Sequence, residues 1–338
     1  MPSALADKGE HGRNCSSVQD SQEGESLSGV AVGGASATPF PGHSTRWSES
    51  ILRSTTPAPC ESFRNQATVG QRARQRGMIL EMEIEGVLLD IDGTLVVSWE
   101  QVPGAAEAIA WLRDREIPFR LVTNTTSQSR KHIAASLVAV GIQVKPEDII
   151  TAVVATASYL RIHHTGAKVF LLSDEGSIAD LGGAELAEEG AEVVVLGGAG
   201  PKFSYEKVNR AFQMVTAGVP LVAMHRSLYW KTSEGLRLDG GAYVRAVEEA
   251  AGVRAAVCGK PAETFFETSC KTLGIPAGRV AIVGDDVVTD VLAGQAVGLT
   301  GLLVKTGKFR PSDLDRSEGI PDYVIQSVAD LPTLPVWS

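Results

Sequence analysis

Cysteine, long apolar runs and excess positive charge are all scarce in this chain of 338 residues. Its four cysteines lack any Cys-x-x-Cys spacing, so neither a disulfide framework nor a zinc site is predicted, and a cytoplasmic location is favoured. No stretch approaches the roughly 18 apolar residues of a membrane span, and the apolar core of a signal peptide is missing. The net charge of −9 disfavours binding to nucleic acid or to an anionic membrane. Small molecules are therefore the favoured partners.

The first 77 residues differ in composition from the rest of the chain. They are rich in Ser, Gly, Thr, Pro and Gln and show no sustained apolar period. Such a segment cannot bury enough apolar surface to offset the entropy lost on ordering, so we predict that residues 1–77 form a disordered tail. The alternative is that translation starts at Met78 or Met82, just before the first predicted strand.

From Glu83 onward, apolar segments of strand length alternate with segments of helix length, which predicts an α/β fold with a doubly wound parallel sheet. Each expected core strand ends at a polar residue or a glycine; these strands are 86–90, 119–123, 255–258, 280–284 and 302–304. The helices expected between them are 104–116, 128–140, 262–273 and 288–297.

A second group of apolar segments, at 168–172, 192–196 and 220–224, lies between the second and third core strands. The intervening stretch has about the 100 residues of one typical domain. We therefore predict a catalytic core made of residues 78–151 and 256–338, interrupted by an α/β cap domain at 152–255.

The sharpest chemical signal is the segment Asp90-Ile91-Asp92-Gly93, where an apolar strand ends. Side chains alternate along a strand, so the two carboxylates start toward the same side, and the glycine lets the backbone turn beneath them. Paired carboxylates repel each other unless a cation or a shared proton relieves them. A solvated turn or part of a calcium loop is the alternative, but a calcium loop needs further oxygen ligands, and apolar residues follow here.

Polar groups also follow other predicted strands. They are Thr123, Asn124 and Thr125 after the second, Lys260 after the third, and Asp285, Asp286 and Asp290 after the fourth. Taken singly, each has an ordinary explanation such as helix capping, which we expect for Asp286. In an open α/β sheet, however, ligands bind outside the carboxyl ends of the strands, where all of these groups lie. Together they offer a nucleophile, an acid/base, anion donors and a cradle for Mg²⁺, which are the parts of phosphoryl transfer.

The order DIDGTLV, VTNTT, GKP and GDDVVTD resembles the four motifs of the haloacid dehalogenase superfamily of aspartate-nucleophile phosphatases. The long interval before GKP resembles the subfamily whose large α/β cap is inserted between the second and third motifs. Within it, FSYE and TGKFRPSD are similar to the group of phospholysine phosphohistidine inorganic pyrophosphate phosphatases. The resemblance covers about residues 83–330. One departure is Asp92, where that group carries Ser.

The resemblance implies a Mg²⁺-dependent phosphatase that acts on a small phosphorylated metabolite through an aspartyl-phosphate. Asp90 is then the nucleophile, Asp92 the general acid and base, and Lys260 their cationic partner, while Thr123, Asn124 and Thr125 bind the phosphoryl group. The expected metal site comprises Asp90, Asp285, Asp290 and the backbone carbonyl of Asp92. A phosphotransferase, a pyrophosphatase or a non-catalytic binding member of the same fold is the alternative.

In the predicted cap, the stretch 225–231 combines aromatic and cationic side chains after a strand. We predict that Tyr229 and Trp230 contact the leaving group of the substrate, with Arg226 and Lys231 offering charge. The alternative is that these aromatics form a homodimer interface through the cap, since Tyr and Trp are enriched in such interfaces.

Overall fold

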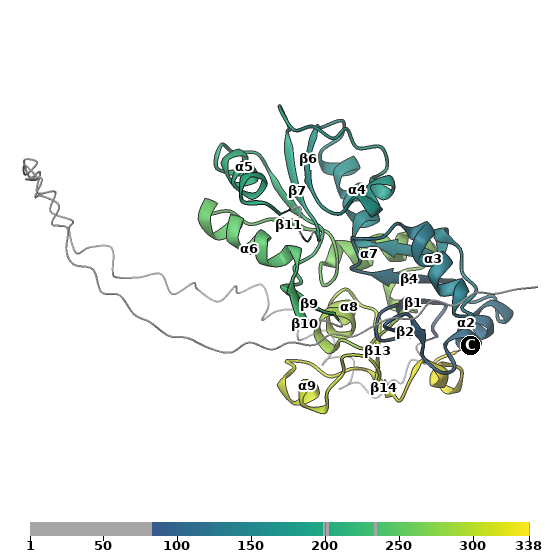
Figure 1. Cartoon of the computed structure of the whole chain (residues 1–338). Coiled ribbons are helices and arrows are strands. Elements are labelled where there is room, and N and C mark those ends of the chain that lie inside the picture. Colours follow the sequence, from purple (N-terminus) through teal and green to yellow (C-terminus); the bar gives the residue numbers. More distant parts are fainter. Residues whose placement is uncertain (1–82, 199, 201–202, 233–234, 338) are drawn as a thin grey trace, which may run out of the picture. The chain divides into compact units, whose positions relative to one another are not determined.

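The structure is a computed structural model that describes residues 83–337, apart from 199, 201–202 and 233–234. The predicted tail, Met78 and Met82 lie outside the described residues. Within the described part, the predicted α/β fold is confirmed, with two parallel sheets and helices packed against them (Figure 1).

The larger sheet has six parallel strands in the order β14-β13-β12-β1-β4-β5. Its strands are β1 (Gly86–Asp90), β4 (Phe119–Thr123), β5 (Ile149–Thr151), β12 (Val280–Gly284), β13 (Thr300–Val304) and β14 (Tyr323–Ile325). Successive residues of the central strand pack into opposite layers, with Leu88 in one apolar cluster and Leu89 in the other. A strand that is covered on both faces has to be apolar throughout, which is why these strands were readable from the sequence.

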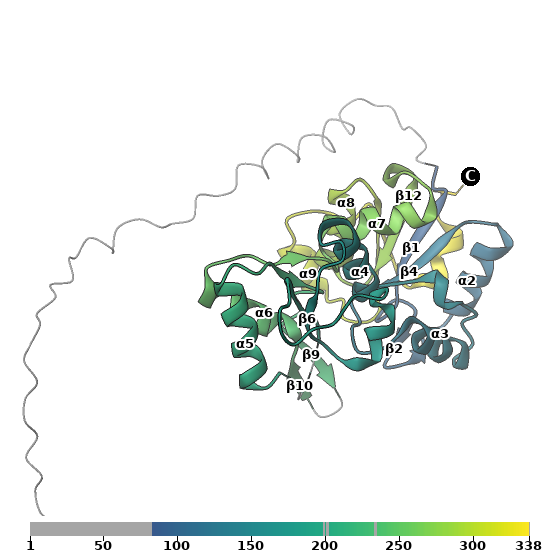
Figure 2. The ribbon, with the colours of Figure 1, turned by 90° about the horizontal axis from the view of Figure 1, so that it is seen from above.

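Helices cover both faces of this sheet. On one face lie α2 (Ala105–Asp114) and α3 (Arg130–Ala139), and on the other lie α7 (Glu263–Leu273) and α8 (Ala293–Ala296), as Figure 2 shows. The helix predicted at 288–297 begins instead as a π-helix, η5 (Val287–Leu292), and continues as α8. Such π-turns are frequent at functional sites, and this one carries Asp290.

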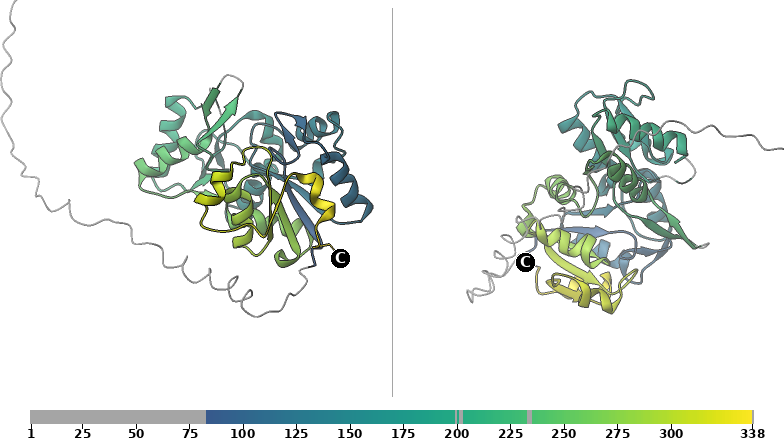
Figure 3. Two further views of the ribbon diagram at one scale, coloured as in Figure 1. Left: turned by 90° about the horizontal axis from the view of Figure 1, so that it is seen from below. Right: turned by 90° about the vertical axis from the view of Figure 1, so that its left-hand side faces the viewer.

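The smaller sheet lies in the inserted part of the chain and is also parallel, with the order β11-β8-β7-β6. Its strands are β6 (Val169–Leu172), β7 (Val193–Leu196), β8 (Leu221–Ala223) and β11 (Ala256–Val257). Three helices pack around it: α4 (Ala152–His163), α5 (Tyr205–Thr216) and α6 (Gly240–Ala251). In Figure 3 this segment, teal to green, stands apart from the blue and yellow ends of the described chain, which meet in the larger sheet.

The strand expected at 255–258 was assigned to the wrong sheet. It pairs with β8 through Ala256 and Val222, and so belongs to the smaller sheet rather than to the core. Periodicity shows that a segment is a strand, but it carries no information about the sheet that the segment joins. The division into core and cap at 151/152 and 255/256 stays a prediction, and the pairing of β11 argues for moving its second boundary past Val257.

The remaining elements are short. The antiparallel ribbons are β2 (Val96–Val97) with β3 (Glu100–Gln101) and β9 (Tyr229–Thr232) with β10 (Gly235–Leu238). The short helical segments are η2 (Pro146–Asp148), η3 (Glu175–Leu181), η4 (Ala277–Arg279), α9 (Pro311–Arg316) and η6 (Val328–Thr333). None of the helices between residues 83 and 337, so far as they are described, is long and apolar enough to span a membrane.

Candidate active site

The predicted site residues come together where the carboxyl ends of β1, β4 and β12 meet. The chain leaves β1 toward β4 on one side and later returns to β12 on the other, so β1 and β12 border the point where the strand order reverses. Crevices at such switch points are where open α/β sheets bind ligands. Asp90 is the last residue of β1, Thr123 the last of β4, and Asp285 directly follows β12.

The ammonium group of Lys260 lies between two carboxylates. Its Nζ is 2.5 Å from Asp90 Oδ1 and 2.6 Å from Asp290 Oδ1, and all three side chains are buried. Burial raises the pKa of Asp90 well above its usual value, although Lys260 opposes the shift. Burial lowers the pKa of Lys260, but the neighbouring carboxylates of Asp290 and Asp90 raise it by more. The pKa therefore lies above its usual value, and this lysine stays protonated. The ion pairs thus hold a charged lysine beside the predicted nucleophile.

Lys260 reaches this place from the smaller sheet, because it follows β11 by three residues. Asn124, at the end of β4, fixes its backbone on both sides: Nδ2 donates to the carbonyl of Lys260 (2.8 Å), and Lys260 N donates to Asn124 Oδ1 (2.9 Å). Both polar atoms of the Asn124 side chain are therefore engaged. In the structure, the Asn124 amide positions the backbone of Lys260. The sequence had predicted a different role for Asn124, a contact with the phosphoryl group.

Asp285 sits in a cradle of backbone. Its Oδ2 accepts a hydrogen bond from Lys308 N (2.6 Å), and the α-carbons of Gly93 and Gly307 approach it so closely that a Cβ on either would lie about 2 Å from Oδ2. Both glycines have positive φ, +97° and +59°, which side-chain-bearing residues rarely adopt. Burial raises the pKa of Asp285 to about 6. Its Oδ1 is buried and has no hydrogen-bond partner among the described residues.

These carboxylates fit a divalent cation. Oxygen atoms of Asp90, Asp285 and Asp290 lie within 4.8 Å of one another. Three carboxylates beside one ammonium leave two negative charges, and hard oxygen donors are the ligands that Mg²⁺ prefers. The unpartnered Oδ1 of Asp285 points to a missing ligand, whereas both oxygens of Asp290 are already engaged, by Lys260 and by the backbone N–H of Asp286. Asp90 and Asp285 are therefore the better metal donors.

Asp92 lies two residues beyond β1 and is exposed, unlike Asp90. Desolvation by the surrounding protein raises the pKa of the Asp92 carboxyl group. The charges of Lys260 and Lys308 and hydrogen bonds with Thr123 and Thr125 oppose this shift. The hydroxyl of Thr123 donates to Thr125 Oγ1 (3.0 Å) and accepts from Thr125 N (3.1 Å). The two threonines thus stand next to Asp92, at the place the sequence predicted for them.

Lys308 was not among the predicted site residues. Its Nζ lies 3.4 Å from Asp286 Oδ2, and the carboxylates of Asp285, Asp286, Asp90 and Asp290 raise its pKa, although partial desolvation of the ammonium opposes the shift. The signal that could have found it is the one used for Lys260, a lysine closely following an apolar strand. Asp286 caps η5 through Val288 N and Thr289 N, as expected.

The sequence of this chain is similar to those of known hydrolases. Residues 87–202 match the haloacid dehalogenase-like hydrolase family, and residues 257–331 match the HAD-hydrolase-like family. The chain is 35% identical over 244 residues to haloacid dehalogenase-like hydrolase domain-containing protein 2 of Homo sapiens, covering 72% of this chain and 93% of that protein. This chain belongs to the haloacid dehalogenase-like hydrolases.

Two further members of the family are similar along most of the described chain. The phospholysine phosphohistidine inorganic pyrophosphate phosphatase of Mus musculus is 33% identical over 253 residues, covering 73% of this chain and 92% of that protein. The structure of p-nitrophenyl phosphatase from Archaeoglobus fulgidus is similar with a TM-score of 0.71 at 29% identity, covering 75% of this chain and all of that chain. The resemblance predicted from the four motifs is confirmed.

In the inserted segment of this hydrolase, Arg226 has an anionic partner within the protein. Its guanidinium is ion-paired with the carboxylate of Glu248, a residue of α6 whose side chain is fully buried. Glu248 also accepts from Ala255 N (2.7 Å). A buried carboxylate needs such partners, so this arginine holds the loop after β8 against α6, and its contact with a substrate stays a prediction.

The predicted specificity residues lie on the ribbon of β9 and β10. Tyr229 is 61% exposed, and its partner across the ribbon, Leu238, is 64% exposed. The backbone of Trp230 belongs to β9, whereas the side chains of Trp230 and Lys231 lie outside the described part. An exposed apolar pair suits either contact with a leaving group or contact with a second protomer, so both predictions stay open.

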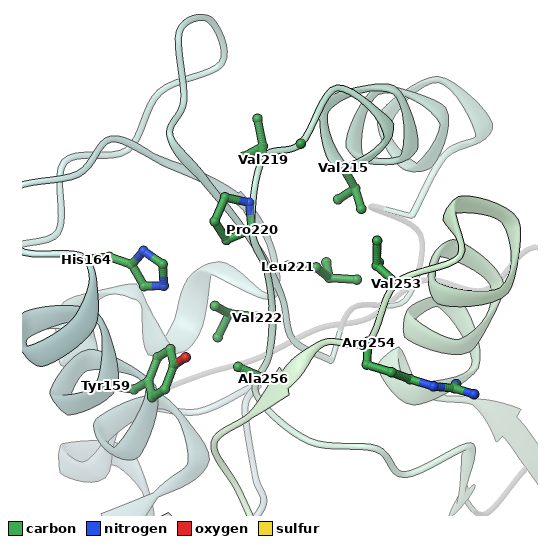
Figure 4. Close-up of a pocket in the computed structure, with 11 residues that line it drawn as sticks. Tyr159, His164, Val215, Val219, Pro220, Leu221, Val222, Val253, Arg254 and Ala256 are labelled. Carbon is green, nitrogen blue, oxygen red and sulfur yellow. The ribbon is translucent and has the colours of Figure 1, made fainter. Parts of the chain in front are cut away.

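A cavity of about 320 Å³ lies at the other end of the smaller sheet, by the amino ends of β8 and β11 (Figure 4). Tyr159 and His164 line it from the end of α4, and apolar residues such as Val222 and Val253 form most of the rest. None of its lining residues is a carboxylate, and it lies away from the carboxyl ends of the strands. It is therefore separate from the site at Asp90.

Proposed function

We propose that this chain is a Mg²⁺-dependent phosphatase that hydrolyses a small phosphorylated metabolite through an aspartyl-phosphate on Asp90. Membership of the family makes the chain a hydrolase. The observation that carries the proposal is the contact of Lys260 with Asp90 and Asp290 beside the unpartnered oxygen of Asp285. The names of the two relatives, one a p-nitrophenyl phosphatase and one a pyrophosphate phosphatase, support phosphate compounds as substrates.

In the first step, a carboxylate oxygen of Asp90 forms a bond to phosphorus, and the bond from phosphorus to the leaving oxygen breaks. Asp92 donates its proton to that oxygen, so the leaving group departs as a neutral alcohol. The raised pKa of Asp92 suits it to hold this proton. Lys260 offsets the negative charge of Asp90 and of the phosphoryl oxygens as they approach each other.

In the second step, the ionised Asp92 takes a proton from water, and the water oxygen attacks phosphorus. The bond from phosphorus to Asp90 breaks, which releases inorganic phosphate and restores both carboxyl groups to their starting states. Asp90, Asp285 and the backbone carbonyl of Asp92 would hold Mg²⁺, with Asp290 fixing Lys260 beside them. When bound, Mg²⁺ supplies positive charge to the phosphoryl oxygens.

The hydroxyl group of Thr125 completes the proposal as a hydrogen-bond donor to the phosphoryl group, and Thr123, which donates its hydroxyl proton to Thr125 Oγ1, orients it. Asn124 contributes by holding the backbone of Lys260. Such a site recognises the phosphoryl head, so discrimination between leaving groups has to come from other surfaces, among them the inserted segment with Tyr229 and Trp230.

The experiment measures inorganic phosphate released from a panel of phosphorylated metabolites, p-nitrophenyl phosphate included, with Mg²⁺ and with EDTA. We expect turnover with Mg²⁺ only, and its loss in Asp90→Asn, which keeps the shape of the side chain but not the nucleophile. Asp114→Asn, an identical change at an exposed position of α2, is the matched control. Turnover in Asp90→Asn above a few per cent, without deamidation, would eliminate the covalent mechanism. Absence of turnover in the unmodified chain would favour a binding role.

A further inference from the structure

Lys308 is fixed at its backbone beside the carboxylate cluster. Its N–H donates to Asp285 Oδ2, the hydroxyl of Thr306 donates to the carbonyl of Gly93, and Gly307 packs against the α-carbon of that same glycine. The segment 306–308 is thereby joined to two of the predicted motifs. The α-carbon of Lys308 is consequently held at the site, independently of the contacts that its ammonium group makes.

The outer end of Lys308 is held loosely. Its side chain is 66% exposed, compared with 4% for Lys260, and the ion pair that it forms within the described part of the chain, with Asp286, is long at 3.4 Å. Asp286 does not depend on this contact, because its other oxygen already accepts two backbone hydrogen bonds from η5. An exposed pair of this kind contributes little stability, so the ammonium is able to exchange Asp286 for a stronger anionic partner.

Two other cations named above are already committed. Lys260 is buried between Asp90 and Asp290, and Arg226 is bound to Glu248. The loop that carries Lys308 stands on the side of Asp92, because Thr306 and Gly307 contact Gly93, the residue directly after Asp92. Asp92 is the residue proposed to protonate the leaving oxygen, so the loop that carries Lys308 borders the side of the site where a leaving group would be.

We propose that Lys308 binds a second anionic group on the substrate, carried by the leaving group close to the bond that breaks. The inference rests on the proposed function and deepens it. It selects phosphoric anhydrides and phosphate esters of small acids as the substrate class, over esters of uncharged alcohols. Lys308 is a specificity-determining residue, and its charge compensates for the repulsion between a second anion and the cluster of carboxylates.

The test compares three substrates: pyrophosphate, whose leaving group is a phosphate ion, phosphoglycolate, whose leaving group carries a carboxylate, and p-nitrophenyl phosphate, whose leaving group has no anionic group besides the leaving oxygen. Lys308→Met removes the charge, and Lys308→Arg keeps it. Lys305→Met is the control, because it removes the same charge from an exposed position of the same loop. KM and kcat are measured for each, together with the calorimetric Kd of Mg²⁺ without substrate.

We expect Lys308→Met to raise KM for pyrophosphate or phosphoglycolate about 10- to 100-fold more than KM for p-nitrophenyl phosphate, the effect of losing one hydrogen bond between charged groups. Lys308→Arg should restore most of this difference, and the substrate that responds identifies the second anion. Equal changes for all three substrates, or no change, would overturn the inference while leaving the proposed function intact. Failure of the unmodified chain to bind Mg²⁺ and to hydrolyse any of them would overturn the proposed function itself.

Discussion

The cradle around Asp285 yields a prediction that separates metal binding from catalysis. A methyl group at Gly307 would lie 2.1 Å from Asp285 Oδ2 and 2.4 Å from the α-carbon of Gly93. A Cβ keeps at least 3.0 Å from atoms to which it is not bonded, so in Gly307→Ala the carboxylate or the loop that carries Gly307 has to move by about 0.9 Å, from 2.1 to 3.0 Å. Metal sites tolerate deviations of only about 0.2 Å in ligand distance. The shift is therefore several times larger than the site can accept.

We expect Gly307→Ala to weaken Mg²⁺ binding by about 10- to 100-fold, the range typical of changes in groups that orient a metal ligand. Isothermal titration calorimetry without substrate measures this Kd directly. The substitution also introduces backbone strain of about 1–2 kcal/mol, because an alanine is placed at a positive φ. Strain alone is therefore a competing explanation for any loss of affinity.

Gly274→Ala is the matched control for that strain. Gly274 ends α7 with a φ of +72°, close to the +59° of Gly307, and a Cβ there would meet nothing within 4 Å. Both variants should lose a similar amount of thermal stability, but only Gly307→Ala should lose affinity for Mg²⁺. A Kd within threefold of the unmodified value in Gly307→Ala, or an equal loss in Gly274→Ala, would refute this account of the cradle.

Three other substitutions test other parts of the molecule. Asp92→Ala should slow the hydrolysis of an alkyl phosphate about 10²- to 10⁴-fold, the usual contribution of a general acid. The hydrolysis of p-nitrophenyl phosphate should slow much less, because its leaving group needs no proton. Equal slowing of both reactions in steady-state assays would contradict the acid role. Arg226→Met should lower the free energy of unfolding by about 3 kcal/mol in urea titrations, because buried Glu248 loses its nearest cation, and an unchanged midpoint would mean that the pair is unimportant. Replacing Tyr229 and Trp230 by Ala should change the ranking of substrates in kcat/KM and leave the sedimentation mass unchanged, whereas a fall from dimer to monomer with the same ranking would make this ribbon an interface.

The positions of most chemical groups could be predicted because they depend on local rules. A strand covered on both faces reads as an apolar run, and the polar residue that ends it marks the carboxyl edge of a parallel sheet. Asp90, Thr123 and Asp285 were found in this way, and the structure places all three at one edge. The capping role of Asp286 is also local, since it involves only backbone groups two and three residues later.

What only the tertiary structure decided are the partners that lie far apart along the chain. Asn124 bonds to the backbone of Lys260, 136 residues away, and Lys308 N bonds to Asp285 across two neighbouring strand ends. The sheet that β11 joins is a decision of the same kind. Apolar periodicity specifies which face of an element is buried, but not the neighbour that buries it, because that choice depends on the strand order and register of the whole fold. The sequence by itself therefore determined the chemistry at each strand end, and the packing of the two sheets determined which of those groups meet.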